Sequence, residues 1–495
     1  MAIKRLFWVL GLVLSFSLLF SCGGKGENPD LKTGDENFGD RDPAGGQTEN
    51  GKSEPNIYEQ FPKTDFEGRD FTILLFDYMQ EEHYSESEIG DVFNDAVYNR
   101  NKKIEEDFNI NLKFRANIYA EVTNDLKKSV LGGDNAYDLG AMHAVAGASV
   151  VGDNLYTDWN KADVIKENLD KPWWNKNVVS GMSIGGKSFF LAGDIGYIFT
   201  AHTHAFLFNK KLFAEAGMEY PYETVKNGTW TYDAFEAMIK NCNQDLNGDG
   251  KLDIKDDRFG FTTMGFFADT MYFYSFGGKI VEKDENDYPV LVLGSERNAS
   301  IIDTGYRWFI ENNCPITTYT GDDDYTKELT HIAFHLDRAY FLGTNLKNLR
   351  VFRDMESEYG IVPFPKLDGS QPDYISNVDG AATMLVLPKG ANIDISATIA
   401  EALARQSSIT VIPAYYDSTL QLKFTRDEAT TEMLKILKDT AYFDLGYIYN
   451  FAGSGFVSKD LLAQKSANLA SYYEKNEAKI QKDIDKLIEY CRNMQ

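Results

Sequence analysis

The side chains with the most specific spacing for chemistry lie in one acidic loop. Its oxygen-bearing residues occupy positions 1, 3, 5 and 9 of the pattern by which a loop binds calcium, and Gly250 occupies the turn position. Calcium is a hard cation that prefers such oxygen ligands. Position 12 departs from the pattern, because an aspartate stands there in place of the longer bidentate glutamate. The spacing predicts a structural calcium site formed by Asp245, Asn247, Asp249, Lys251, Asp253 and Asp256. The alternative is an acidic turn that holds no ion.

The histidines form no recognisable metal motif. His331 and His335 are four residues apart and would share a helix face. The metalloprotease motif needs a glutamate at its second position, and isoleucine stands there. His202 and His204 would lie on one face of a strand, but nothing local brings them to His143. We expect solvated or core histidines rather than a metal site.

The sequence also lacks the usual marks of an enzyme. There is no Gly-x-Ser-x-Gly nucleophile elbow and no glycine-rich phosphate loop, so we expect neither an ATPase nor an organic cofactor. With 75 acidic residues, a pair of carboxylates suited to glycoside cleavage stays an open alternative. The main prediction is a protein that is not an enzyme.

Aromatic side chains gather near predicted loops and segment ends. Flat aromatic faces suit the apolar faces of sugar rings, while Asp and Asn side chains suit sugar hydroxyl groups. For any single aromatic residue, core packing is the competing interpretation. The groups concerned are Trp173–Trp174, Tyr197–Phe199, Trp230, Tyr272–Tyr274, Tyr415–Tyr416 and Tyr447–Phe451.

The elements that must position these residues alternate in type. An apolar run suits a buried parallel strand, and a helical pattern follows it. This βαβαβ alternation predicts an open α/β sheet, in which ligands bind beyond the carboxyl ends of the strands. That rule selects Asp77–Tyr78 and Met142–His143. The predicted strands are 71–76, 110–114 and 137–142, and the predicted helices are 91–108 and 121–131.

The pattern repeats further along the chain. Thr231 is placed to cap a helix that begins after Trp230. Residues 193–203 could carry the chain into a second domain, and the strand at 381–387 would return to the first. The tail from residue 458 is predicted to be helical. Further strands are predicted at 188–191 and 204–208, and a further helix at 210–216.

The N-terminus predicts where the protein works. Lys4 and Arg5 precede an apolar run that ends in Leu19-Phe20-Ser21-Cys22. The run is too short for a membrane span, which needs about 20 residues, and it matches a signal peptide. Its ending resembles a bacterial lipobox, in which Cys22 is lipidated. We therefore expect a signal peptide at 1–21, a flexible lipid-anchored linker at 22–65, and an extracytoplasmic protein held to the cell membrane.

The net charge and the cysteine spacing exclude some kinds of partner and site. The chain of 495 residues has a net charge of −25, which argues against nucleic acid because that partner needs a basic surface. Three cysteines remain beside Cys22, and their spacing fits neither a zinc site nor a redox pair. Buried thiols are the main expectation for Cys242, Cys314 and Cys491, although one disulfide is possible.

Several longer stretches resemble the extracellular solute-binding lipoproteins of carbohydrate ABC transporters, which are related in fold to maltose-binding protein. The likeness covers roughly residues 66 to 450. The stretches are Leu169-Asp-Lys-Pro-Trp-Trp174, Phe208-Asn-Lys-Lys-Leu-Phe213, Asn227-Gly-Thr-Trp-Thr231 leading to the acidic loop, Tyr359-Gly-Ile-Val-Pro-Phe-Pro-Lys366 and Val411-Ile-Pro-Ala-Tyr-Tyr-Asp417.

This resemblance implies an α/β, two-lobed, periplasmic-binding-protein-like (type II) fold. The lobes would comprise 66–199 plus 378–445 and 200–377 plus 446–495, with crossings near 195–203, 377–384 and 443–450. It also implies a monomer that captures a saccharide by hinge closure and delivers it to an ABC permease.

Sugar contacts are not carried over from the resemblance; we expect them at strand ends, crossings and aromatic residues. The expected substrate-binding residues are Asp77, Tyr78, His143, Trp174, Asp194, Tyr197, Trp230, Asp379 and Tyr416. The alternatives are a surface-anchored enzyme acting on glycans, a sensory or scaffold protein without a permease, and a binding protein for another solute such as a peptide.

Overall fold

A computed structural model describes residues 63–312, 314–317, 328–419 and 428–494. The chain divides into two compact units, Met1–Glu54 and Pro55–Gln495, and the second unit contains every residue described below. The expected signal peptide, the lipidation site Cys22 and nearly all of the linker fall outside these ranges. Within them, no helix combines the length and the apolar character that crossing a membrane requires.

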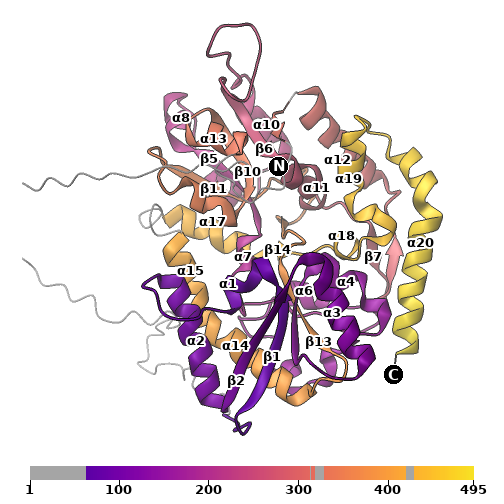
Figure 1. The fold of residues 1–495 in the computed structure, drawn as a ribbon. Helices are drawn as coiled ribbons and strands as arrows, with labels where there is room; N and C mark the ends of the chain where they lie inside the picture. The colour runs from indigo at the N-terminus through magenta and orange to yellow at the C-terminus, as the bar shows by residue number, and fades with distance from the viewer. Residues whose placement is uncertain (1–62, 313, 318–327, 420–427, 495) are drawn as a thin grey trace, which may run out of the picture. The chain divides into compact units, whose positions relative to one another are not determined.

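The first sheet contains the predicted βαβαβ unit. Its order is β2-β1-β3-β13-β4, with β1 parallel to β2 and β3, and β13 antiparallel to β3 and β4 (Figure 1). The apolar side chains from Leu74 to Phe76 are buried, as the sequence predicted for a central strand. The strands are β1 (Arg69–Phe76), β2 (Ile110–Asn117), β3 (Leu139–His143), β4 (Tyr156–Thr157) and β13 (Thr383–Pro388).

Helices connect these strands where local signals predicted them. Helix α2 begins after Asp91, whose side chain accepts a hydrogen bond from the Asn94 amide, and it ends at Asn109 in the left-handed conformation. We call this sheet and its helices the first lobe. Its helices are α1 (Gln80–His83), α2 (Val92–Phe108), α3 (Tyr119–Gly132), α4 (Ala144–Ser149), α5 (Asp163–Asn168), α6 (Lys176–Met182) and α14 (Ile393–Ile409).

The second sheet has the order β11-β5-β10-β6-β9. Strand β5 is antiparallel to β10 and β11, whereas β6 is parallel to β10. All six residues of β5 are buried. These strands are β5 (His204–Asn209), β6 (Phe259–Met264), β9 (Ile316–Thr317), β10 (Ala339–Asn345) and β11 (Tyr359–Val362).

The helices around this sheet complete the second lobe. Thr231 caps α10 by accepting a hydrogen bond from the Ala234 amide, which confirms that prediction. Helix α11 packs against β6 and β10, and α17 packs against β11. The helices are α8 (Lys210–Glu215), α9 (Tyr222–Lys226), α10 (Tyr232–Ile239), α11 (Gly265–Ser275), α12 (Glu296–Tyr306), α13 (Leu329–His335) and α17 (Glu428–Asp439).

The strand predicted at 188–191 does not form. The amide and carbonyl of Ser188 pair with the Asp158 side chain and the Trp159 amide instead of a neighbouring strand. Only Leu191 makes an isolated bridge, to Leu385 of β13. The apolar run is buried as predicted, but its backbone hydrogen bonds are divided between residues 158–159 and Leu385 of β13.

Three segments of chain lie side by side between the two sheets. The first contains α7 (Ile198–Ala201) and ends at Thr203, which bridges to Val378 in the second. The Val378 amide donates to Tyr442 of the third. The short strands β12 (Ser376–Asn377) and β14 (Ala441–Tyr442) pair in parallel at the same place. We call these the crossing segments.

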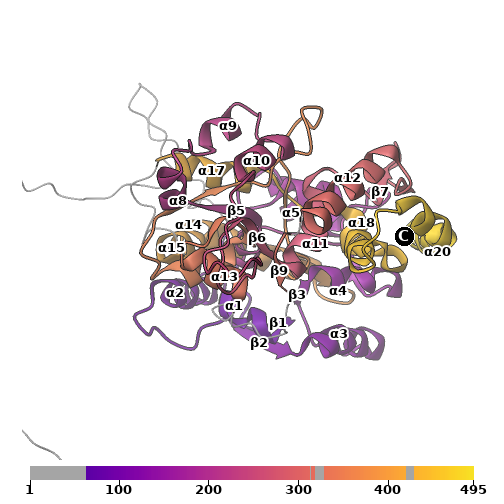
Figure 2. The same cartoon turned by 90° about the horizontal axis from the view of Figure 1, so that it is seen from above.

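The C-terminal tail is helical, as predicted. It contains α18 (Leu445–Tyr449), α19 (Val457–Ala463) and the long α20 (Leu469–Asn493). Helix α20 packs beside α12 and the hairpin of β7 (Val281–Lys283) and β8 (Pro289–Leu291), as Figures 1 and 2 show. The remaining helix, α15 (Val411–Thr419), packs against α2 and α14.

Candidate functional site

Strand ends of both sheets meet around one buried carboxylate, that of Asp379. Strand β3 ends at His143 and β10 at Asn345, while β5 begins at His204. The Asp379 amide donates to the carbonyl of His202 at 3.0 Å, and its carboxylate lies 3.9 Å from Nε2 of His204. In open α/β sheets, ligands bind at this edge. We define the strand-end cluster as His143, His202, His204, Asn345, Asn377 and Asp379.

The segment that carries Asp379 is also bonded to the first lobe. The amides of Ala144 and Val145 donate to the carbonyls of Ala382 and Gly380, and the hydroxyl of Tyr78 donates to the Ala381 carbonyl at 2.9 Å. A side chain at Gly380 would come within 2.6 Å of Val145. Only glycine permits this close approach of backbone and helix. The cluster is therefore anchored to both lobes.

Several polar atoms of the cluster are buried without partners. Both ring nitrogens of His202 and the side-chain carbonyls of Asn345 and Asn377 have no hydrogen-bond partner among the described residues. These side chains are 5%, 3% and 0% exposed. Leaving such a group unpaired costs about 1–3 kcal/mol, so each one calls for an explanation. Together they offer hydrogen-bonding capacity that the surrounding chain does not use.

The cluster combines the negative charge of Asp379 with the neutral imidazoles of His143 and His202. Burial lowers the pKa of His143 and of His202 to about 4, against the weaker opposing effect of the Asp379 charge. Burial alone would raise the pKa of Asp379, but the neighbouring side chains of His204 and His202 lower it to about 2. At neutral pH the site therefore presents an anionic acceptor and imidazoles that can donate or accept hydrogen bonds.

A second buried carboxylate supports the cluster from α1. Glu82 is 0% exposed and accepts hydrogen bonds from the Thr383 hydroxyl and, at 2.9 Å, from the Ile198 amide. Its Oε1 lies 3.1 Å from Nε2 of His83. Burial would raise its pKa, but the interaction with His83 and these hydrogen bonds lower the pKa below its ordinary value. Glu82 thus ties the start of the first crossing segment to Thr383, where the second crossing segment ends and β13 begins.

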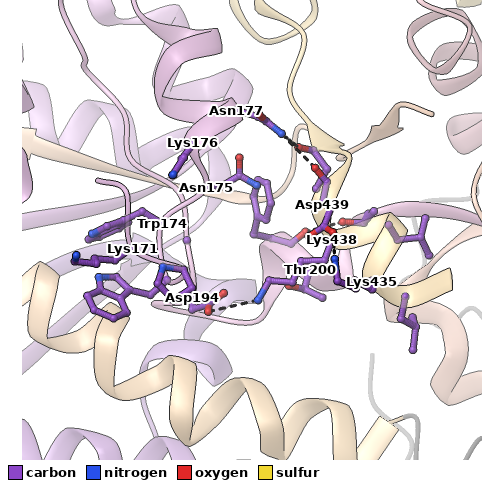
Figure 3. Close-up of a pocket in the computed structure, with 18 of the residues that line it drawn as sticks. Lys171, Trp174, Asn175, Lys176, Asn177, Asp194, Thr200, Lys435, Lys438 and Asp439 are labelled. Atoms are coloured by element: carbon purple, nitrogen blue, oxygen red, sulfur yellow. Dashed lines mark hydrogen bonds and ion pairs between the residues drawn. The ribbon is translucent and has the colours of Figure 1, made fainter. Parts of the chain in front are cut away.

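On the other face of the first crossing segment lies an open cavity of about 600 Å³. Its walls come from residues 170–177 and 193–194 of the first lobe and from α17 of the second (Figure 3). Thr200 and Thr203 of the first crossing segment also line it. Four lysines and three aspartates line it. We call it the lysine-lined cavity after Lys171, Lys176, Lys435 and Lys438.

Three of the expected substrate-binding residues line this cavity: Trp174, Asp194 and Tyr416. The Asp194 carboxylate lies 3.8 Å from Nζ of Lys438, the ion pair drawn in Figure 3. Burial raises the pKa of Asp194 to about 6 despite that lysine. The Trp174 indole donates at 2.7 Å to Glu401, whose pKa burial raises to about 7. The indole is 4% exposed and presents little surface for stacking.

The other expected residues separate into different environments. Tyr78, His143 and Asp379 lie at the strand ends, and Asp77 is exposed beside them, with its carboxylate accepting from the Tyr78 amide. Tyr197 donates to Glu81 and stacks on Tyr415 with ring centres 4.6 Å apart. These positions do not form one continuous site.

Trp230 is not placed to contact a solute. Its side chain is 0% exposed, stacks on Phe341 of β10 and donates to the Pro363 carbonyl. The expected binding role is therefore corrected to core packing in the second lobe. An indole with a satisfied N–H is a favourable core residue, and residue type alone does not separate the two roles.

The sequence interpretation missed His202, His204, Asn345 and Asn377 as site residues. The available signal was the pair of histidines two residues apart at the start of a predicted strand. Their approach to Asp379 depends on the bridge of Thr203 to Val378, and the pairing of β5 with β10 brings Asn345 beside His204. Despite these histidines, no group of three or more His, Cys, Asp or Glu residues in the described part of the chain is arranged to hold a metal ion.

The acidic loop has ordered turn geometry. Asp245 accepts hydrogen bonds from the amides of Gly248 and Gly250, and Asp253 accepts one from the Lys255 amide. The buried carboxylate is Asp257, which accepts from the amides of Leu246 and Asp253. These turns satisfy the loop backbone, and its calcium site stays a prediction.

Comparison with known proteins gives a clear result only at the level of structure. No family model matches the chain, and no curated protein matches its sequence. An ABC transporter solute-binding protein from Agrobacterium radiobacter K84, in complex with ribitol, is 16% identical; the match covers 86% of this chain and 100% of that one, with a TM-score of 0.50.

Two further structures give similar values. A cyclo/maltodextrin-binding protein complexed with maltotetraose is 12% identical, with 86% and 98% of the two chains covered and a TM-score of 0.51. The GacH receptor of Streptomyces glaucescens, solved unliganded and with acarbose, is 14% identical, with 86% and 100% covered and a TM-score of 0.50. At these identities the likeness establishes the fold: the chain has the two-lobed, type II periplasmic-binding-protein architecture predicted from its sequence.

Proposed function

We propose that this protein is the extracytoplasmic solute-binding component of an ABC importer and that its solute is a saccharide. The observation that carries the proposal is the strand-end cluster, in which Asp379 joins both lobes beside buried polar atoms without partners. A solute with several hydroxyl groups can donate to the carbonyls of Asn345 and Asn377 and to the Asp379 carboxylate. It can also pair with His202.

Aromatic surface lies next to this polar set. Tyr119, at the start of α3, is 49% exposed, and its ring centre is 4.9 Å from that of His143. Phe76 lies 5.6 Å from the Tyr119 ring and 5.8 Å from the imidazole. An exposed ring beside hydrogen-bonding groups is the combination that suits a pyranose, whose faces are apolar and whose edges are polar. The maltotetraose and the acarbose bound by two of the similar structures favour the same class of solute.

Burial of the cluster requires the lobes to separate before a solute enters. The crossing segments connect the lobes and would act as the hinge, so that a solute touching both lobes favours the closed form. A membrane permease that recognises the closed form would then receive the solute. The lipobox at Cys22 would keep the protein near that permease, because lipid anchoring restricts it to the membrane surface.

A thermal-shift screen tests the proposal. The sample is residues 55–495, which form one compact unit, and the panel contains mono- and oligosaccharides, peptides and polyols. A solute at about 100 times its dissociation constant adds about 2.7 kcal/mol to the free energy of unfolding. We expect a rise in melting temperature with one sugar class, and recovery of that sugar intact. A rise only with peptides would show that the solute is a peptide and not a saccharide. Cleavage of the sugar would show that the protein is an enzyme and not a binding protein.

A further inference from the structure

A hairpin of the second lobe is docked on a turn of the first lobe, away from the crossing segments. Strands β7 and β8 follow α11, which packs on the second sheet, and precede α12. At the hairpin tip, the carbonyl and the carboxylate of Asp287 accept the amides of Gly185 and Gly186, each at 2.9 Å. The ammonium of Lys283 donates to the Ser180 carbonyl at 2.6 Å and to the Ser183 hydroxyl at 2.8 Å.

The turn of the first lobe is shaped for this contact. Gly185 has a φ of +57°, and a side chain there would come within 2.6 Å of the Tyr288 ring. Glycine therefore meets two requirements at once, the left-handed backbone and the close approach of the ring. Three residues later, Ser188 bonds to the Asp158 side chain and the Trp159 amide, which fixes the turn to the first lobe.

Helix α20 reinforces the same connection. Near its start, Tyr473 packs against Gly294, which lies between β8 and α12 of the second lobe. Near its end, the Tyr490 hydroxyl donates at 3.3 Å to Asn154, and the Tyr490 ring lies 6.3 Å from that of Phe189, both in the first lobe. The Arg492 guanidinium stands 4.8 Å from the centre of the Tyr288 ring.

The helix is held along its length by an apolar stripe. Ile480, Ile484, Leu487 and Cys491 are spaced by three and four residues and are all buried. Figure 1 shows α20 running from the level of α12 down beside the first lobe. A helix of 25 residues spans roughly 37 Å, long enough to contact both lobes.

We propose that the β7–β8 hairpin and the C-terminal half of α20 form a clasp that ties the two lobes together outside the crossing segments and sets how far they separate. The clasp joins the two lobes at a second place besides the crossing segments. A hinge motion must therefore either break the clasp contacts or rotate the lobes about them. The clasp acts on the lobes themselves, so the inference does not depend on which solute binds.

The test is small-angle X-ray scattering on residues 55–495 without added solute, combined with scanning calorimetry. A triple variant, Lys283→Met with Asp287→Ala and Tyr288→Ala, removes the side-chain contacts of the hairpin. The matched control, Lys279→Met with Glu282→Ala, removes a solvent-exposed ion pair of 3.1 Å in the same region and keeps the bonds of Lys283 and Asp287 to residues 180–186. Circular dichroism checks that each variant is folded.

We expect the triple variant to have a larger radius of gyration, by about 1 Å on a value near 22 Å, and to unfold in two resolved transitions. The control should match the wild-type protein in both measurements. Arg492→Ala, which leaves the hairpin bonds intact, should give a smaller change in the same direction. If both clasp variants are folded and show the wild-type radius and a single transition, the clasp is contradicted. If the triple variant is unfolded, the outcome with Arg492→Ala decides alone.

Discussion

The two faces of the first crossing segment differ in the burial and the pairing of their charged groups. On one face, the strand-end cluster buries Asp379 and leaves atoms of His202 and Asn345 without partners. On the other face, the lysine-lined cavity is open, and its charged groups pair with one another, as Lys438 does with Asp194 and Lys435 with Asp439. Both faces draw residues from both lobes. The cluster leaves buried polar atoms without partners that a bound solute could satisfy, whereas the buried carboxylate of Asp194 in the cavity already has Lys438 as its partner.

This contrast shows that the volume of a cavity and the number of unsatisfied hydrogen-bonding groups in a site are separate criteria for a binding site. The open cavity has the volume of a small-molecule site, but its aspartates already form ion pairs with solvent-exposed lysines, so they do not require a further partner. The strand-end cluster has unmet hydrogen-bonding capacity in a low-dielectric setting, where each added bond is worth more. We therefore place the solute at the cluster, and the following changes should show how differently the two faces respond.

The largest expected effect is the loss of Glu82. Glu82→Ala should lower the free energy of unfolding by about 4 kcal/mol, because His83 and the Ile198 amide lose their buried partner. Urea denaturation of the variant and the wild-type protein measures the difference. Glu82→Gln, which keeps the shape and one acceptor, should lose clearly less. Equal and small losses in both variants would show that the carboxylate does not support the crossing segments.

Acid should weaken the cluster face. The pKa of His202 is about 4 in the folded protein and about 6.5 when unfolded, so the unfolded state binds more protons between these values. The contribution of His202 to the free energy of unfolding is fully present above pH 6.5, and about 2–3 kcal/mol of it is lost as the pH drops to 4. Denaturation midpoints across this range measure the slope. His202→Gln should reduce the slope by about half, because burial lowers the pKa of His143 to the same value, and an unchanged slope would place the titration elsewhere.

In the lysine-lined cavity, the change of stability with pH should have the opposite sign. The pKa of Asp194 is about 6 in the folded protein, above its ordinary value of 3.8, so the folded state holds the proton longer. Its contribution to stability is therefore greatest below pH 3.8, and about 2 kcal/mol is lost as the pH rises to 6. Asp194→Asn should remove that loss. The comparison fails if this variant and the wild-type protein keep a constant difference in stability from pH 4 to 7.

The smallest effect is expected for Lys438. Its ammonium is 3.8 Å from Asp194, and its side chain is 47% exposed. Lys438→Met should change the free energy of unfolding at pH 7 by no more than about 0.5 kcal/mol. Thermal denaturation measures this change. A loss above 2 kcal/mol would mean that the ion pair is a structural element and that the cavity face is less open than its geometry indicates.

Local signals in the sequence were sufficient for much of the fold. The apolar run at 71–76, the helical pattern at 91–108 and the cap at Thr231 each act within a few residues, and each appears in the structure. The prediction of a strand at 188–191 was wrong, because Ser188 bonds to Asp158, a residue that is distant in the sequence. Pairing partners of this kind are set by the whole fold.

The site was only partly accessible from sequence for the same reason. The strand-end rule selected Tyr78 and His143, which do lie at the edge of the sheet beside Asp379. It could not select Asn345, because the second sheet places that residue through the register of β5 and β10. Aromatic type was a poor guide on its own, since Trp230 is a core residue.

The most direct test is isothermal titration calorimetry with the sugar that gives the largest thermal shift. The proteins are residues 55–495 in wild-type form, with Asp379→Asn and with Lys438→Met. We predict that Asp379→Asn raises the dissociation constant about 100-fold, equivalent to about 2.7 kcal/mol, because an anionic acceptor is lost, and that Lys438→Met leaves it within twofold. The reverse pattern, with binding lost in Lys438→Met and kept in Asp379→Asn, would contradict the assignment and move the solute to the lysine-lined cavity.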